Sequence, residues 1–199
     1  MNNFEKDVEV LKDMLDDFAS YEEADFYDAF SNMCLKYSGS SYDAYNLYCY
    51  ILQNNIPMES YYLQALMDVY AYYSVDNEFL DILEETLECD CSEYTKKSHE
   101  MIKDYIQDGF VIAYRGEVSI GDNSNLSYED SVSYSLDYDE AKHFATRFND
   151  VANVTRSVVY TFKVPVEDVI AYIDREDEVV CRPISRGGKM EIVKEENFV

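Results

Sequence analysis

Three short polar segments in the last third of the chain carry the residue types that a binding or catalytic site needs. They are Tyr114-Arg115-Gly116, Ser133-Tyr134-Ser135 and Glu176-Asp177-Glu178. Side chains alternate between the two faces of an extended strand, so Ser133 shares a face with Ser135, and Glu176 shares one with Glu178. Each pair lies in a run of Val, Ile, Tyr and Ala. An arginine, a serine pair and a carboxylate pair on apolar strands predict a site for an anionic, sugar-containing ligand.

The segments around these residues are expected to be mainly β-structure with one helix. A short apolar run ends at Arg115-Gly116, a second strand ends at Ser135, and Pro165 ends a strand with clear alternation. Asp137 is a cap for the helix, whose face is expected to consist of Ala141, Phe144, Ala145 and Phe148, with Phe144 in the core. The predicted strands cover residues 110–114, 131–135, 158–164, 169–173, 178–182 and 190–193, and the predicted helix covers residues 138–148.

The first hundred residues show helical periodicity instead. Apolar residues recur at three- and four-residue spacing in about six segments, of which the first is residues 4–18 and the sixth is residues 92–109. Many of these residues are tyrosines, and a tyrosine stripe at helical spacing is typical of an amphipathic core. The pattern predicts an α+β protein, with an acidic helical lobe at residues 1–106 and a β-rich core at residues 107–199.

The charge of the chain is strongly negative and uneven. The formal net charge is −25; residues 1–100 hold 22 acidic and five basic residues, and all six arginines follow residue 100. Such a charge disfavours binding to nucleic acid or to an anionic membrane, and it favours a basic protein partner. A solvated acidic face is the simple interpretation of the helical lobe, and mimicry of nucleic acid is the alternative.

The five cysteines show no spacing typical of a zinc site, so reduced thiols and no metal are expected. The first residues lack the basic and apolar regions of a signal peptide, and no apolar run reaches 18 residues. A cytoplasmic location is the expectation.

Residues 107–195 resemble the mono-ADP-ribosyltransferases of the arginine–serine–glutamate class, of the bacterial toxin and bacteriophage type. The resemblance rests on the order of the three segments, on the helix reading Glu140-Ala141-Lys142-His143-Phe144-Ala145, and on the strand 159–165 that ends in Val-Pro. It implies an ADP-ribosyltransferase-like split β-sandwich, in which two small sheets surround a cleft for NAD and helices precede the first strand. NAD would be the co-substrate.

The resemblance also implies a role for each residue. Glu178 would hold a ribose hydroxyl and stabilise the oxocarbenium-like carbon, and Glu176, the first residue of the Glu-x-Glu motif, would orient an arginine acceptor. Arg115 would contact the phosphates or ribose of NAD, and Gly116 would let the backbone approach the nicotinamide. Ser133 would brace Glu178, with Ser135 as a second support. A further candidate is Tyr138, for stacking on nicotinamide. The turn before Glu176 is shorter than in the family and lacks its acceptor-reading aromatic residue, so either the helical lobe or Tyr172 would take over that task.

The leading hypothesis is therefore transfer of ADP-ribose from NAD to an arginine of a basic protein. The expected target is a nucleic-acid-binding or host defence protein. If the protein belongs to a phage or is a bacterial effector, the reaction takes place in the cytoplasm of the host. Three alternatives remain open at this point. One is an acidic, non-enzymatic inhibitor that mimics nucleic acid, and another is an NAD glycohydrolase that uses the same residues. The third is transfer of ADP-ribose to a nucleic-acid base, which the charge disfavours.

Overall fold

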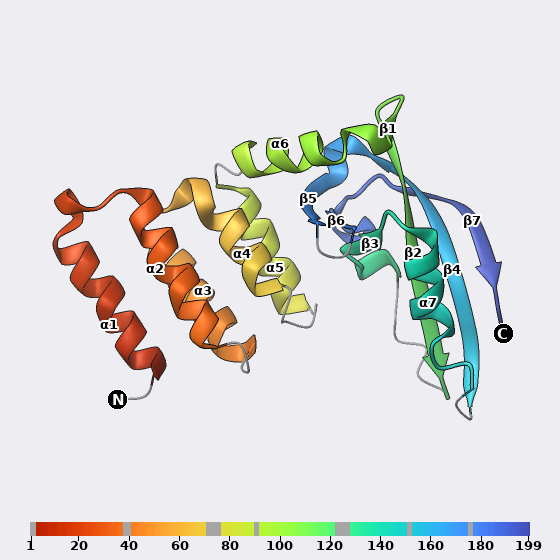
Figure 1. Ribbon diagram of the computed structural model, residues 1–199, viewed down its shortest axis with the longest axis horizontal. Helices are drawn as coiled ribbons and strands as arrows, with labels where there is room; N and C mark the ends of the chain where they lie inside the picture. Colours follow the sequence, from red (N-terminus) through yellow and green to blue (C-terminus); the bar gives the residue numbers. More distant parts are fainter. Residues whose placement is uncertain are drawn as a thin grey trace. The chain divides into compact units, whose positions relative to one another are not determined.

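The α+β architecture predicted from the sequence is confirmed in a computed structural model of the chain (Figure 1). The structure describes residues 3–37, 41–70, 77–89, 92–121, 128–150, 153–174 and 177–199. The chain forms two compact units, Met1–Tyr94 and Thr95–Val199. The boundary between them lies in the first turn of helix α6 (Ser92–Met101). The expected domain boundary at residues 106 and 107 stays a prediction.

The helical region contains amphipathic helices, of which the first five pack against one another. The α-helices are α1 (Asn3–Asp16), α2 (Glu23–Lys36), α3 (Ser41–Gln53), α4 (Tyr62–Tyr70), α5 (Asn77–Leu87) and α6 (Ser92–Met101), with short 3-10 turns η1 (Phe18–Ser20) and η2 (Glu59–Tyr61) between them. A capping box, in which Glu22 and Asp25 each accept a backbone N–H of the other residue, begins α2. Large apolar side chains such as Phe26, Phe30 and Leu66 are fully buried.

Several tyrosines of this region belong to its core, as the helical spacing predicts, whereas Tyr21 is exposed. Tyr45, Tyr48 and Tyr62 are almost completely buried, and the Tyr62 hydroxyl donates a hydrogen bond of 2.6 Å to the carbonyl of Ile56. The predicted stripe of the first helix is only partly right, because Leu11 is buried but Phe18 lies beyond the helix and is 54% exposed.

Asp7 is a buried carboxylate that fastens α1 to α2. It is 5% exposed, it accepts a 2.7 Å hydrogen bond from the Tyr37 hydroxyl, and Lys36 Nζ lies 3.3 Å away. Burial, together with this bond to Asp7, raises the pKa of Tyr37. The arrangement satisfies a charge that would otherwise be costly to bury.

We expect Tyr37→Phe to destabilise the helical unit by about 1–3 kcal/mol, because it removes a partner from a buried carboxylate. Urea unfolding followed by circular dichroism measures the change. Tyr21→Phe is the matched control, since Tyr21 is 38% exposed, and its cost should be within about 0.5 kcal/mol. Equal midpoints for the two variants would contradict the role of the Asp7–Tyr37 bond.

The second unit is built on an open antiparallel seven-stranded sheet with the order β5-β6-β3-β2-β4-β7, in which β1 pairs with β2. The strands are β1 (Ile106–Gln107), β2 (Phe110–Ile120), β3 (Ser133–Ser135), β4 (Val154–Pro165), β5 (Val169–Ile173), β6 (Glu178–Cys181) and β7 (Glu191–Asn197). The other elements are α7 (Tyr138–Thr146) and the 3-10 turns η3 (Lys103–Tyr105), η4 (Tyr128–Asp130), η5 (Val166–Asp168) and η7 (Ile184–Arg186). The long pair β2–β4 runs from Phe110 opposite Pro165 to Ile120 opposite Val154.

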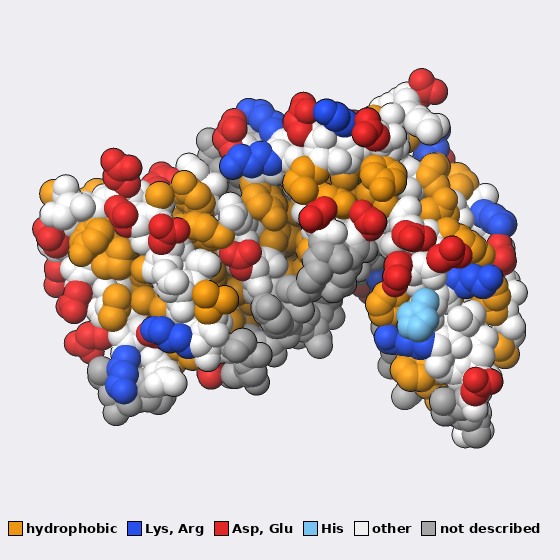
Figure 2. Space-filling model, viewed as in Figure 1, with side chains coloured by type: hydrophobic (Ala, Val, Ile, Leu, Met, Phe, Trp, Pro, Cys, Tyr) orange, Lys and Arg blue, Asp and Glu red, His pale blue; other side chains and the backbone are white. Residues whose placement is uncertain are grey.

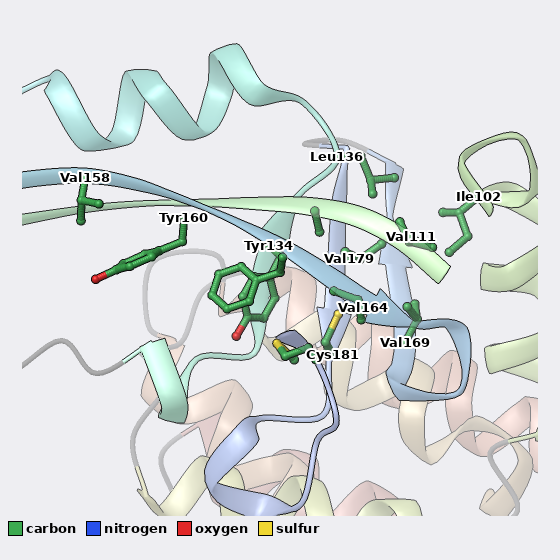
Figure 3. Close-up of a cluster of buried hydrophobic side chains, with 13 residues drawn as sticks. Ile102, Val111, Tyr134, Leu136, Val158, Tyr160, Val164, Val169, Val179 and Cys181 are labelled. Atoms are coloured by element: carbon green, nitrogen blue, oxygen red, sulfur yellow. The ribbon is translucent and has the colours of Figure 1, made fainter. Parts of the chain in front are cut away.

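The main core of this unit lies on one face of the sheet (Figure 3). Tyr134, Tyr160 and Phe162 form its aromatic centre, and the Tyr134 and Phe162 rings meet edge to face at 5.0 Å. Val179 and Cys181 extend it onto β6. The alternation of β4 predicts this burial correctly.

α7 covers the other face of β2 and β4 (Figure 1). Ala141 and Ala145 are buried against Val159, and the Ala145 carbonyl accepts a 2.7 Å hydrogen bond from the buried Ser157 hydroxyl. The prediction that Phe144 belongs to the core is wrong, since its side chain is 44% exposed. The helix lies so close to the sheet that only small residues fit between them, and Phe144 is left at the side.

The end of α6 also differs from the prediction. The helix ends at Met101 and not near residue 109, and the chain continues through η3 into β1. Ile102 leaves the helical stripe to join the sheet core, whereas Met101 and Tyr105 are exposed. Periodicity could not separate a helix from the 3-10 turn and short strand that follow it.

Two further findings concern the described residues of both units. Within the described ranges, no helix is both long and apolar enough to cross a membrane. The described cysteines Cys34, Cys49, Cys89 and Cys181 carry free thiols.

Candidate functional site

The register of three neighbouring strands places one residue from each of the three predicted segments in one row. Tyr114 on β2 lies opposite Ser135 on β3, and Ser135 lies opposite Glu178 on β6. Adjacent strands are about 4.8 Å apart, so Glu178 lies roughly 10 Å from β2 across the sheet. Residues opposite each other share a face of the sheet, which places Ser135 directly beside Glu178.

β2 and β3 diverge immediately after this row. Their pairing is confined to Tyr114 and Ser135, although both strands continue beyond it. The Arg115 guanidinium enters the gap, where its Nη1 donates a 2.9 Å hydrogen bond to the Ser133 carbonyl. A side chain thus satisfies an acceptor that the ladder between the strands no longer reaches.

A pocket of about 610 Å³ opens where the strands separate. Its volume lies within the range of about 300–1,000 Å³ that is typical of small-molecule sites. Three parts of the fold form it, namely the middle of β2, one side of α7, and β3 together with the β5–β6 turn and the start of β6. The lining residues are Tyr114, Arg115, Gly116, Glu117, Val118, Ser133, Ser135, Asp137, Glu140, Ala141, Phe144, Arg147, Asp174, Asp177 and Glu178.

The pocket gathers most of the residues proposed from the sequence. Arg115, Gly116, Ser133, Ser135 and Glu178 all line it, although up to 63 positions separate them in the chain (115 to 178). Glu178 is 9% exposed and therefore nearly enclosed.

Two proposed residues stand apart from this set. Glu176 lies outside the described residues. Tyr138 is not among the described side chains that line the pocket; its hydroxyl donates a 2.9 Å hydrogen bond to Glu196 Oε1, and its ring meets Tyr114 edge to face at 5.6 Å. This bond to Glu196 is the main reason that the pKa of Tyr138 is raised. The contacts of Tyr138 fasten the start of α7 to β2 and β7.

Glu117 is a pocket residue that the sequence reasoning missed. Its Oε1 accepts a 3.0 Å hydrogen bond from Arg115 Nε, and its side chain is 7% exposed. Burial raises the pKa of the Glu117 carboxyl, and the charge of Arg115 beside it opposes that shift. The i, i+2 spacing of Arg115 and Glu117 on a strand could have indicated the pair, since it puts both side chains on one face.

The two serines differ in what they do. The Ser135 hydroxyl accepts a 3.0 Å hydrogen bond from the Asp137 backbone, and Asp137 in turn caps α7 by accepting from Asp139 N at 2.7 Å. Ser133 lies opposite Val180, one diagonal step from Glu178, so Ser135 is the direct cross-strand neighbour of that carboxylate. Ser135 therefore links the position of Glu178 to the start of α7.

The turn before Glu178 is held by Tyr172. Asp177 adopts a left-handed backbone conformation with φ of 46°, its Oδ1 accepts a 2.6 Å hydrogen bond from the Tyr172 hydroxyl, and its carbonyl accepts from Leu136 N at 2.7 Å. These bonds hold a strained residue beside Glu178. The Tyr172 hydroxyl, a candidate for reading an acceptor, is thus engaged in supporting the turn.

An aromatic and cationic edge borders the pocket on α7. The Arg147 guanidinium lies 4.8 Å from the ring centres of both Phe144 and Phe148, which is a cation–π arrangement. Phe144 and Arg147 line the pocket, and both are exposed. An exposed ring beside a guanidinium suits a flat base or a phosphate.

Gly116 has a structural explanation of its own. A Cβ at this position would lie 1.8 Å from the Ala141 carbonyl oxygen and 2.8 Å from Ala145 N. These are backbone atoms of α7, so the glycine is what permits the close contact of helix and strand. The prediction that its backbone approaches nicotinamide remains open beside this role.

The charge of the lining is mixed. Six carboxylates and two arginines line the pocket. Among the residues that the structure describes, no three His, Cys, Asp or Glu side chains are grouped so as to hold a metal ion. The site can therefore offer both cationic contacts to an anion and carboxylates to a cation.

Comparison of the chain with models of known protein families, with curated proteins and with solved structures gives no significant match. The functional argument consequently depends on the geometry of the pocket and on the residue pattern described above.

Proposed function

We propose that the protein is an NAD-dependent mono-ADP-ribosyltransferase that modifies an arginine of a basic target protein. The observation that carries the proposal is the pocket that unites Arg115, the two serines and Glu178. Their order along the chain is that of the arginine–serine–glutamate transferases, and the register of β2, β3 and β6 gives that order a common location.

The divergence of β2 and β3 supports the same class of fold. The strands form two groups, β5-β6-β3 and β1-β2-β4-β7, joined through the single pair Tyr114–Ser135. An ADP-ribosyltransferase-like split β-sandwich has two small sheets around an NAD cleft, and the pocket here opens where the two groups part.

The residue types suit the chemistry of the transfer. The bond between nicotinamide and ribose breaks, nicotinamide leaves with the electron pair, and the ribose carbon becomes oxocarbenium-like, a transition state that carboxylates stabilise in glycoside hydrolysis. Glu178 would supply that carboxylate and hold a ribose hydroxyl. A nitrogen of the acceptor arginine then forms the new bond to that carbon and loses a proton, for which Glu176 is the candidate base.

The charges of the lining residues suggest where the pyrophosphate of NAD and the acceptor arginine would bind in the pocket. Arg115 and Arg147 would contact the pyrophosphate of NAD, since guanidinium groups match phosphate geometry. Phe144 offers a ring for a base. The carboxylates Asp174 and Asp177 in the turn beside Glu178 suit the guanidinium of an incoming arginine.

The acidic surface favours a basic acceptor protein. Acidic side chains are spread over the visible face of the helical unit (Figure 2), and residues 1–100 hold 22 acidic but five basic residues. Complementary charge accelerates the encounter of two proteins and falls in effect with salt. A nucleic-acid-binding protein is the kind of target that this charge would attract.

Arg115→Ala is the variant that tests the binding of NAD. Removing the guanidinium should raise the KM for NAD roughly tenfold to hundredfold, the loss expected for charge-assisted hydrogen bonds of about 1.5–3 kcal/mol. The assay is the transfer of label from NAD labelled in the adenylate part to proteins of a lysate, followed by mass spectrometry of the modified residue. Arg186→Ala is the control, because Arg186 is not among the described residues that line the pocket.

The same assay separates the rival functions. Free ADP-ribose without a labelled protein would identify a glycohydrolase. The non-enzymatic inhibitor that mimics nucleic acid would be favoured by two results together. The parent protein would neither cleave NAD nor transfer ADP-ribose, and the Arg115→Ala variant would keep full biological activity.

A further inference from the structure

We propose that Glu117 is a positioning residue for Arg115, and that the ion pair between them sets the affinity of the pocket for the anionic part of its substrate. The identification of that anion as the pyrophosphate of NAD rests on the proposed function. The pairing itself rests on the geometry of the strand.

Two contacts fix the plane of the Arg115 guanidinium. Nε donates to Glu117 Oε1 at 3.0 Å, and Nη1 donates to the Ser133 carbonyl at 2.9 Å. A planar group held at two of its nitrogens has little freedom, so its third nitrogen, Nη2, keeps one direction. Without Glu117, the Ser133 carbonyl would be the one of these two contacts that remains.

The pair differs from an ordinary surface ion pair in its burial. The side chains of Arg115 and Glu117 are 23% and 7% exposed, whereas those of the Lys189–Glu167 pair are 70% and 67% exposed. Water screens a buried pair less, so the charge of Glu117 acts strongly on whatever Arg115 binds. An anion that approaches Arg115 is attracted by the guanidinium and repelled by the Glu117 carboxylate beside it, since both side chains line the pocket.

Several other charges and titratable groups surround Glu117. Arg156 of β4 also attracts its negative charge, and Tyr134 and Tyr160 lie within its electrostatic reach. The remaining carboxylates of the pocket are Asp137 and Glu140 at α7, and Asp174, Asp177 and Glu178 at the β5–β6 turn. Their titration adds to any pH dependence of anion binding, and a comparison with a variant at Glu117 separates its own part.

The direction of the pH effect follows from the burial of Glu117, which raises the pKa of this carboxyl above its ordinary value. As the pH falls through that raised pKa, Glu117 takes up a proton and its repulsion of the anion ends. The neutral acid can still accept from Arg115 Nε through its carbonyl oxygen. Affinity for an anion should therefore increase on acidification while the orientation of Arg115 is kept.

The experiment compares the full-length parent with Glu117→Gln and Glu117→Ala. Calorimetry gives the dissociation constants of NAD and of inorganic pyrophosphate between pH 8 and about pH 4.5, the ordinary pKa of a glutamate carboxyl. Glu117→Gln keeps an acceptor for Nε without the charge, so it should bind pyrophosphate roughly three- to tenfold more tightly than the parent at pH 8. It should also lose the part of the pH dependence that Glu117 causes.

Glu117→Ala removes the charge and the acceptor together, so it should bind at least about fivefold more weakly than Glu117→Gln. The NMR signal of the Arg115 Nε–H reports the orientation directly. It should remain protected from exchange in the Gln variant and lose protection in the Ala variant. The Gln variant thus keeps the inference testable even if the Ala variant does not fold.

The outcomes distinguish this inference from the proposed function. If the parent neither binds nor cleaves NAD but the pyrophosphate affinities follow the expected order, the proposed function fails and the role of Glu117 stands. Parallel pH profiles for the parent and Glu117→Gln, or an equal pyrophosphate affinity for both, would overturn the role of Glu117. Failure of the parent to bind either probe would overturn it as well.

Discussion

Glu178→Gln should reduce the cleavage of NAD by roughly 10²–10³-fold while its dissociation constant for NAD changes by less than about threefold. The glutamine has nearly the same size as the glutamate and fits the enclosed place beside Ser135, where Glu178 is 9% exposed. It lacks the negative charge that the oxocarbenium-like carbon requires. Release of nicotinamide, measured by chromatography with and without a protein acceptor, gives the rate, and calorimetry gives the binding.

Glu191→Gln is the matched control for this variant. It makes the same chemical change on an exposed position of β7, away from the described residues that line the pocket. Its rate should equal that of the parent. A Glu178→Gln variant that keeps more than half of the parent rate would exclude Glu178 as the catalytic carboxylate.

Gly116→Ala should have the largest effect on stability, about 3 kcal/mol or more. The new Cβ would lie 1.8 Å from the Ala141 carbonyl oxygen, and backbone atoms cannot rotate out of its way. α7 would have to move off β2, with loss of the Ser157–Ala145 hydrogen bond and of the contacts of Ala141 and Ala145 with Val159. Overpacking of this kind costs about 1–3 kcal/mol and occasionally more.

Thermal unfolding and NAD binding should therefore change together in Gly116→Ala. The midpoint should fall by roughly 6–12 °C, and the affinity for NAD should fall because α7 lines the pocket. Gly109→Ala is the control: its φ is +82° and no atom lies within 4 Å of the added Cβ. Its cost should be confined to about 1–2 kcal/mol of backbone strain, with NAD binding unchanged. Equal stability of the Gly116→Ala and Gly109→Ala variants would contradict the close contact between α7 and Gly116.

Local patterns were sufficient for much of the fold. The helical spacing around Phe26, Phe30 and Leu66 predicts a buried stripe, and the alternation along β4 predicts which of its side chains enter the core. Both patterns are strong because a helix or strand with one buried face repeats its apolar residues at a fixed interval. The cap at Asp137 was equally local, since the side chain bonds to a backbone N–H two residues further along the chain.

The errors arose where a neighbouring element decides the outcome. Phe144 belongs to the apolar pattern of its helix, but the contact of α7 with Gly116 admits only Ala141 and Ala145 and leaves the ring at the pocket. Similarly, Ile102 continues the stripe of α6 in sequence and yet packs into the sheet core after the helix has ended. Neither position can be obtained from periodicity, because both depend on a surface formed by distant residues.

The chemical types of the candidate site could be read from the residues alone: an arginine, two serines and a glutamate on short strands, in that order. The row of Tyr114, Ser135 and Glu178, the separation of β2 and β3 beside Arg115, and the bond of Glu117 to that arginine became visible only in the folded chain. This is because strand register and divergence depend on pairing between segments far apart in the chain, here 21 positions from Tyr114 to Ser135 and 43 positions from Ser135 to Glu178. A side chain in such a gap acquires its partner and its charge environment only when the strands have met.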